Sequence, residues 1–286
     1  MEMTPLVPNL RAEKAVVSFT GWPDAGGLSS RILEEVNRLE PCLQVAVWDL
    51  EGYWHTSELR PHVVIRHGRV QHLEWPEFRT FMPTDGSRPP FFLGIGTEPS
   101  LGWRRFSVQL LKTLKEWGCR EILLLGSLYD QIFYDEIRIS GLAHDPEGYN
   151  RLQAWGCQPA EYEGPGAIHA PILEAAPHLE IRALNLWAHV PFYLKEPHGL
   201  LLHRLMEILG DFLERRWDLT HLETAWRDQE KEIEEMLSQD SSLAEQIKAL
   251  QKEDPVRPAG DAPDGGARVI RLDRFKKKDP PKGKGR

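Results

Sequence analysis

Short apolar segments alternate with helix-forming segments through most of this chain, and this order limits the possible fold more than any other feature. The apolar segments have the length and composition of strands, whereas the longer ones repeat apolar residues at helical spacing. The predicted strands are 15–19, 43–48, 90–95, 121–125 and 181–187, and the predicted helices are 28–39, 101–117 and 167–176. Helices that connect parallel strands cover the faces of a sheet. The pattern therefore predicts an α/β fold, a layered sheet with crossover helices.

One pair of segments breaks the alternation. Residues 62–66 and 69–73 flank the dipeptide His67-Gly68, and a two-residue turn between two such runs is typical of an antiparallel β-hairpin. The sheet is therefore expected to be mixed, or to carry a protruding β-arm. The register implied by the turn places His72 opposite Val63, so the histidines of the hairpin do not form a metal-binding trio.

The histidine and cysteine spacings predict no metal site. The eleven histidines include no HExxH pair, and Cys42, Cys119 and Cys157 are far apart and form no CxxC. We expect the cysteines to be buried, reduced thiols. No apolar run approaches the ~20 residues that span a bilayer, and the first ten residues lack the charge and apolar core of a signal peptide. These features predict a cytoplasmic protein without membrane contact.

The spacing of apolar residues becomes helical after Pro197 and stays so. A first stripe predicts a helix to about Arg216, and a second stripe follows in the alternating three- and four-residue steps of a heptad repeat. The members of this second stripe, called the seam, are Leu219, Leu222, Trp226, Ile233, Met236, Leu243, Ile247 and Leu250. The helix can break and restart at Asp240, because Ser242 and Glu245 form a capping box. The seam either packs on its own domain or pairs with another chain.

An acidic body carries a basic C-terminal tail. Residues 268–286 hold nine lysines and arginines against two aspartates, a net charge of +7 in a chain of net charge −8. The preceding stretch is rich in Pro, Gly and Asp and predicts a flexible linker. The tail could contact nucleic acid or an acidic membrane surface, or it could dock on the acidic residues 219–254 of the same chain. Nucleic acid is not the expected partner. The predicted organisation is an N-terminal extension (1–13), an α/β core (14–218), a helical extension (219–253), and a linker with the basic tail (254–286).

A glycine-bearing loop, FTGWPDAGGLSS at 19–30, joins a predicted strand to a predicted helix, as phosphate-binding loops do. A Walker loop requires a lysine and a hydroxyl residue where Gly27 and Leu28 stand. A dinucleotide fingerprint requires a glycine where Pro23 stands. The loop is therefore expected to be structural, with Asp24 capping the following helix.

Two further glycine-bearing loops follow predicted strands, at 94–99 and 126–130. If the three strands are parallel, their carboxyl ends share one edge of the sheet, where crevices form. We call the residues expected to line this edge the rim: Trp22, Asp24, Glu98, Ser127 and Asp130. Asp24 and Glu98 either form a carboxylate pair for acid–base chemistry or serve as caps and loop anchors. Ser127 lacks the G-x-S-x-G setting of a hydrolase elbow, so no catalytic residue and no cofactor is predicted.

Taken together, these segments resemble the proteasome assembly chaperone 2 family. The matching segments are FTGWPDAGG at 19–27, the hairpin at 62–73, GIGTEPSLGWRRF at 94–106, LLLGSLYD at 123–130, EGPGAIHAPILEAA at 163–176, NLWAHVPFYLKEPHGLLLHRL at 185–205 and, as in bacterial members, EKEIEEML at 230–237. The case rests on their order and spacing over roughly residues 14–240.

The resemblance implies a three-layer α/β/α sandwich like that of purine nucleoside phosphorylases, with a mixed, largely parallel sheet, the hairpin arm and C-terminal helices. It also implies self-association and the binding of proteins rather than turnover of a substrate. Some members insert a C-terminal hydrophobic-Tyr-X tail into proteasome pockets, whereas this chain ends in Lys-Gly-Arg. It also carries Gln-Ile-Phe-Tyr at 131–134, where many relatives have a Pro-His-Thr-Arg-like segment.

Two functions follow as hypotheses. The first is a non-catalytic, self-associating chaperone-like or scaffold protein that binds copies of itself and a further protein partner. The alternative is a small-molecule protein, a nucleoside-like binder or an enzyme, that uses a crevice at the rim.

Overall fold

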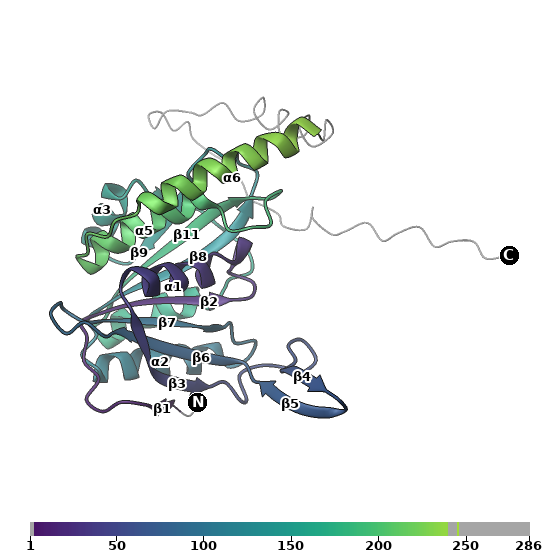
Figure 1. Ribbon diagram of the computed structural model, residues 1–286. Helices are drawn as coiled ribbons and strands as arrows, with labels where there is room; N and C mark the ends of the chain where they lie inside the picture. The colour runs from purple at the N-terminus through teal and green to yellow at the C-terminus, as the bar shows by residue number, and fades with distance from the viewer. Residues whose placement is uncertain (1–2, 240–244, 246–286) are drawn as a thin grey trace.

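The structure is a computed structural model, which describes residues 3–239 and residue 245. Its centre is a nine-stranded sheet with the strand order β1-β3-β6-β7-β2-β8-β11-β9-β10 (Figure 1). The strands are β1 (Met3–Pro5), β2 (Lys14–Thr20), β3 (Cys42–Asp49), β4 (His62–Arg66), β5 (Arg69–Glu74), β6 (Glu77–Pro83), β7 (Phe91–Thr97), β8 (Glu121–Asp130), β9 (Ile139–Ala143), β10 (Gln158–Pro159) and β11 (Arg182–Pro191). The helices are η1 (Ala25–Gly27), α1 (Leu28–Leu39), α2 (Trp103–Glu116), α3 (Pro146–Ala154), α4 (His169–Ala175), η2 (Pro177–Leu179), α5 (Gly199–Leu213) and α6 (Thr220–Gln239). None of these described helices has the length and apolar content of a membrane span.

The middle of the sheet is parallel and covered on both faces. β2 pairs in parallel with β7 and β8, and β8 pairs in parallel with β11. Helices α2 and α4 pack on one face, and α1, α3 and α5 pack on the other. Strands buried on both faces are apolar throughout rather than alternating, which is why the sequence pattern locates them. β3, β6 and β9 join antiparallel neighbours, so the α/β sandwich is confirmed with a mixed sheet.

Strands β4 and β5 form a separate two-stranded sheet, the arm (residues 62–74), which projects from the body (Figure 1). The turn between them has positive φ at His67 (51°) and Gly68 (72°). Positive φ at both central residues is the property of the type I′ turn, whose twist suits a hairpin. The expected hairpin is therefore present and lies outside the main sheet.

The register of the arm differs from the predicted one. Val63 lies opposite Leu73, and His72 lies opposite Val64, so the expected pairing of His72 with Val63 is wrong. A β-bulge causes the difference: Gln71 has no register partner in β4, and the pairs on the two sides of it are therefore offset by one residue.

The C-terminal helices α5 and α6 pack against each other. Helix α5 ends at Leu213, before the expected end near Arg216, because Glu214 adopts a left-handed conformation with a φ of 58°. The next side chain, Arg215, is buried and donates two hydrogen bonds to the carboxylate of Glu40, at 2.8 and 3.2 Å. This ion pair holds the end of α5 against the end of α1.

Candidate functional site

The turns that follow β2, β7 and β8 lie at one edge of the sheet, because these neighbouring strands are parallel. Two backbone hydrogen bonds join the turns. The N–H of Glu98 donates to the carbonyl of Thr20 at 3.0 Å, and the N–H of Ser127 donates to the carbonyl of Pro23 at 2.8 Å. The edge that the sequence predicts therefore exists, and the roles of its side chains can be assigned one by one.

Asp24 and Ser127 hold the loop between β2 and α1. The Oδ1 atom of Asp24 accepts the backbone N–H of Ser29, in the first turn of α1, at 2.7 Å. Burial raises the pKa of Asp24, and its hydrogen bonds with Ser29 oppose that shift. The hydroxyl of Ser127, which is buried, donates to the carbonyl of Ala25 at 3.0 Å. Both side chains are engaged in the geometry of the loop.

Glu98 holds the start of α4 in the same way, by accepting a backbone hydrogen bond. Its Oε1 atom accepts the N–H of Ile168, the residue before α4, at 2.9 Å. Burial raises the pKa of Glu98, and the hydrogen bond from Ile168 opposes that shift. Asp24 and Glu98 therefore serve the starts of two different helices, the anchoring role rather than a shared acid–base site.

Aromatic rings lie beneath the open part of the rim. Trp22 is 54% exposed and meets Trp187 edge-on, with 6.3 Å between the ring centroids. Trp187 in turn lies 5.0 Å from the ring of the buried His169. Gly126 makes room for this arrangement, because a Cβ atom there would come within 2.8 Å of the Trp187 ring. The rim thus presents one exposed indole over a packed aromatic floor.

A chain of hydrogen bonds runs through the fifth rim residue, Asp130. Its Oδ2 atom accepts from Nδ1 of His189 at 2.8 Å and from the guanidinium of Arg138 at 3.1 Å. The other ring nitrogen of His189, Nε2, lies 2.7 Å from the hydroxyl of Ser140. Burial pushes the pKa of Asp130 upward, but the hydrogen bond from His189 and the charge of Arg138 hold it below its ordinary value. An ionised Asp130 fixes the proton on Nδ1, so Nε2 is left to accept from Ser140.

Neither Ser140 nor His189 belongs to the rim that the sequence predicts. His189 lies two residues beyond the predicted strand 181–187, and β11 continues past it to Pro191. Its place at the carboxyl end of a predicted strand is the sequence signal that could have identified it as a rim residue. Ser140 lies in β9, whose sequence ISGLA is too short and too mixed to identify a strand. In the described part of the chain, no group of three metal-ligating side chains lies close enough together to hold a metal ion.

The arm is a second candidate site, of a different kind. The register places four aliphatic side chains on one of its faces, and all of them are exposed: Val63 (44%), Ile65 (58%), Val70 (64%) and Leu73 (39%). We call these four residues the arm face. Trp75, directly after β5, is 55% exposed and continues the same surface toward the body. Contiguous exposed apolar surface of this kind marks interaction sites more often than isolated apolar residues do.

The described part of the seam lies largely against the chain's own body. Leu222 is buried in the same core cluster as the side chains of α5, and Trp226 and Ile233 are buried in a smaller cluster. Leu219 packs at the margin of the core, and Met236 remains 37% exposed. The seam positions outside the described residues are Leu243, Ile247 and Leu250.

Comparison with models of known protein families places the chain in one of them. The model of the PAC2 family matches residues 18–237. The chain belongs to the PAC2 family. The match runs from the end of β2 to the end of α6 and so includes the rim, the arm and the described seam. No protein with a curated description matches the sequence.

Solved structures of PAC2-like proteins share this fold. A Mycobacterium tuberculosis protein, described as the proteasome-assembly chaperone homologue Rv2125, is 27% identical, with a TM-score of 0.74 over 82% of this chain and 99% of that one. A PAC2 family protein from Streptomyces avermitilis is 28% identical, with a TM-score of 0.69 over the same shares. PbaB of Pyrococcus furiosus, described as an archaeal proteasome activator, is 14% identical, with a TM-score of 0.63 over 82% of this chain and 98% of that one. At that identity, the likeness to PbaB concerns the fold alone.

Proposed function

We propose that this chain is a chaperone-like scaffold protein that binds protein partners and associates with copies of itself. The observation that carries the proposal is the arm face, four exposed aliphatic side chains on a projecting hairpin. Apolar surface left open in this way gains free energy when a partner covers it, roughly 25 cal/mol for each Å² removed from water.

Two further observations support protein binding. The polar rim residues Asp24, Glu98 and Ser127 hold the chain's own turns and helix starts, so they are not free for a substrate. The relatives include a proteasome-assembly chaperone homologue and, at the level of the fold, a proteasome activator. The expected partner is therefore a protein, bound in the cytoplasm.

Light scattering coupled to size-exclusion chromatography tests the self-association. The full chain has a mass of 32.8 kDa, and we expect a larger, concentration-dependent mass that returns toward this value on dilution. A mass that stays at the monomer value at the highest attainable concentration would contradict the proposal.

The hydrogen-bond chain at Asp130 favours a second candidate function, a small-molecule binder or enzyme at the rim. An Asp–His–Ser chain with the histidine proton on the Asp side is the arrangement that activates serine nucleophiles. A thermal-shift screen of nucleosides and nucleotides tests it, since a ligand at 100 times its Kd stabilises by about 2.7 kcal/mol. A serine-directed fluorophosphonate provides a second test, with Ser140→Ala as its control. Absence of both a shift and Ser140-dependent labelling would leave the scaffold as the better function.

A further inference from the structure

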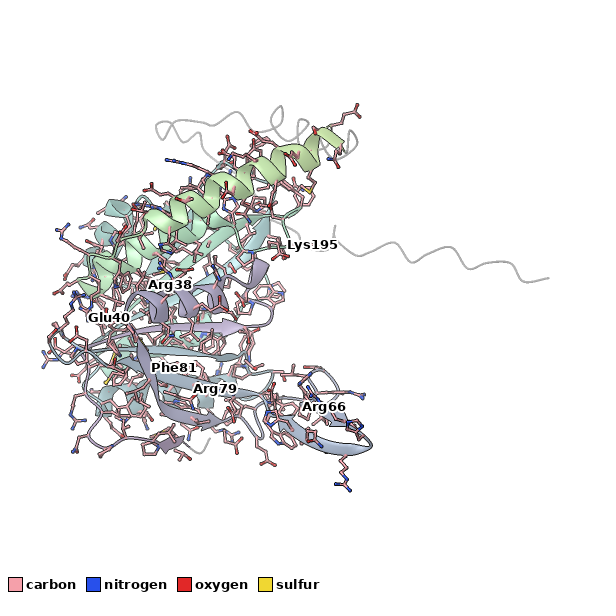
Figure 2. The ribbon with its side chains drawn as sticks, viewed as in Figure 1. Arg38, Glu40, Arg66, Arg79, Phe81 and Lys195 are labelled. Atoms are coloured by element: carbon pink, nitrogen blue, oxygen red, sulfur yellow. The ribbon has the colours of Figure 1, made fainter. Side chains whose placement is uncertain are left out.

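We propose that Ser140 is the nucleophile of an esterase site that takes carboxylic esters with an apolar or aromatic acyl group, with His189 as its base. The inference rests on the second candidate function above and names its substrate class. The site lies apart from the arm. Figure 2 shows Lys195, in the loop that follows β11, at the edge of the sheet where β8 and β11 end, away from Arg66 on the arm.

The hydroxyl of Ser140 has no structural task like that of Ser127, which holds the loop before α1. Ser140 lies inside β9, and the backbone of β9 pairs with β11 on one side and with β10 on the other. This pairing does not need the side chain. Ser140 is half-buried, and in the described part of the chain its hydroxyl makes a single hydrogen bond, to Nε2 of His189 at 2.7 Å. The hydroxyl is therefore available for chemistry.

His189 is held in the orientation of a base for this hydroxyl. The residue is 8% exposed, and its backbone N–H donates to the carbonyl of Arg138 at 2.9 Å. Its Nδ1 atom lies 2.8 Å from Oδ2 of Asp130, which also accepts from the guanidinium of Arg138. The negative charge of Asp130 keeps the ring proton on Nδ1, so Nε2 presents its lone pair to Oγ of Ser140.

The neighbours of Ser140 on the sheet suit an apolar acyl group. Its register partners are Trp187 in β11 and Gln158 in β10, and register partners have their side chains on the same face of a sheet. Trp187 and the exposed Trp22 that meets it offer an indole surface to the acyl group. The side chain of Gln158 is exposed and makes no hydrogen bond among the described residues. Its amide can donate to the oxyanion of a tetrahedral intermediate.

The charges around Ser140 favour a neutral ester over a phosphoester. Arg138 supplies the guanidinium of this network, and it is already engaged by two carboxylates, Asp130 at 3.1 Å and Glu136 at 2.7 and 3.0 Å. It is therefore not free to bind an anionic substrate. The rim carboxylates Asp24 and Glu98 would also repel an anion, whereas a neutral ester meets neither obstacle.

The reaction needs water as its only co-reactant. Oγ of Ser140 attacks the ester carbonyl carbon and gives its proton to Nε2 of His189. The bond between the acyl carbon and the alcohol oxygen then breaks, and the departing alcohol takes that proton. Water next attacks the acyl group on Ser140, with His189 accepting a proton from water and returning it to Oγ, and the carboxylic acid is released.

Hydrolysis of 4-nitrophenyl butyrate and 4-nitrophenyl benzoate by the full chain tests the substrate class. We expect a burst of 4-nitrophenol and one acyl group on Ser140, located by peptide mass spectrometry. Ser140→Ala is expected to lose the burst and to hydrolyse both esters at least about a hundredfold more slowly. Ser57, in an exposed turn, gives the matched control: Ser57→Ala is expected to react like the wild type. The thermal unfolding midpoints of both variants are expected to stay near that of the wild type.

Asp130 acts through His189 and is a positioning residue. An amide at this place donates to Nδ1 and so moves the ring proton to Nε2, where it blocks proton transfer from Ser140. We expect Asp130→Asn to hydrolyse the esters at least about a hundredfold more slowly at pH 7. Its rate should then rise with hydroxide concentration, because hydroxide replaces the lost base. Damaged packing alone would not produce this pH profile, so a rate that stays low at all pH values would overturn the role of Asp130.

The outcomes separate the inference from the functions on which it depends. Equal hydrolysis by Ser140→Ala and the wild type would overturn Ser140 as the nucleophile. Labelling of Ser140 by the fluorophosphonate without hydrolysis of either ester would overturn the substrate class and leave the second candidate function standing. Absence of both would remove that function as well. Light scattering of Ser140→Ala is expected to give the same self-association as the wild type, so the scaffold function is judged independently.

Discussion

Replacement of His169 by glutamine tests how the aromatic floor of the rim responds to pH. The His169 side chain is fully buried between the rings of Phe19 and Trp187, at centroid distances of 5.6 and 5.0 Å. Its Nε2–H donates to the carbonyl of Leu125 at 3.0 Å, and its Nδ1 has no hydrogen-bond partner among the described residues. The ring is therefore held in its neutral form, because a proton on Nδ1 would create a buried, unpaired charge.

The expected size of the effect follows from the pKa. Burial lowers the pKa of His169 from 6.5 to about 4, against a smaller upward effect of the bond to Leu125. The unfolded chain takes up the proton near pH 6.5, but the folded chain does not until about pH 4. The free energy of unfolding is therefore not reduced by His169 above pH 6.5, and it decreases as the pH falls below that value. Linkage gives a loss of about 2 kcal/mol between pH 7 and pH 5 from this one residue.

Urea unfolding of the wild type and of His169→Gln at pH 7, 6 and 5 measures this loss. Glutamine can donate to the carbonyl of Leu125 but does not titrate, so its structural cost is the same at each pH. We expect the variant to have a lower free energy of unfolding than the wild type at pH 7. The difference between the two proteins should be smaller by about 2 kcal/mol at pH 5. Comparison of the two proteins cancels the other titrating groups. A gap that is constant with pH would refute the assignment of a buried, neutral His169.

Two further predictions concern the C-terminal helices. Trp226→Ala removes the ring that stacks on His198, at 5.0 Å between the ring centroids. We expect the free energy of local unfolding of α6 to fall by about 3–5 kcal/mol. Amide hydrogen exchange should therefore become faster in α6 and stay unchanged in β2 and β8. Arg215→Met leaves Glu40 as a buried, unpaired charge and is expected to lower the free energy of unfolding by about 3–5 kcal/mol. The double variant Glu40→Met/Arg215→Met removes both charges and should recover most of that loss in chemical denaturation; no recovery would show that the pair is not what holds the two helices together.

The parts of the fold that could be predicted are those where burial is uniform. Helix α1 has the bounds expected from its spacing, 28–39, and β2 extends the predicted 15–19 by one residue at each end. The strands that the sequence does not reveal lie toward the sides of the sheet. β6 carries charged residues between its apolar ones, and β9 is short and small in side chain, so neither has the continuous apolar pattern of a strand covered on both faces.

The residues of the candidate sites could likewise be predicted only where a local sequence pattern identifies them. The rim residues follow predicted strands, and the parallel pairing of β2, β7 and β8 brings their turns to one edge. Ser140 and His189 join the site only through the antiparallel pairing of β9 with β11, a long-range contact that no local pattern contains. The arm shows a third limit: two segments and a turn predict the hairpin, but the bulge at Gln71 sets which side chains share a face.

In an open α/β sheet, ligands often bind where helix starts face the carboxyl ends of strands, because free backbone N–H groups there attract anions. In this chain, carboxylates of its own occupy two such starts: Asp24 accepts from Ser29 at α1, and Glu98 accepts from Ile168 before α4. A phosphate at either place would have to displace a bound carboxylate and face its negative charge. The chain's own carboxylates thus occupy these two helix starts, whereas the described residues leave the side chains of the arm face 39–64% exposed. This difference is the physical reason to assign partner binding to the arm.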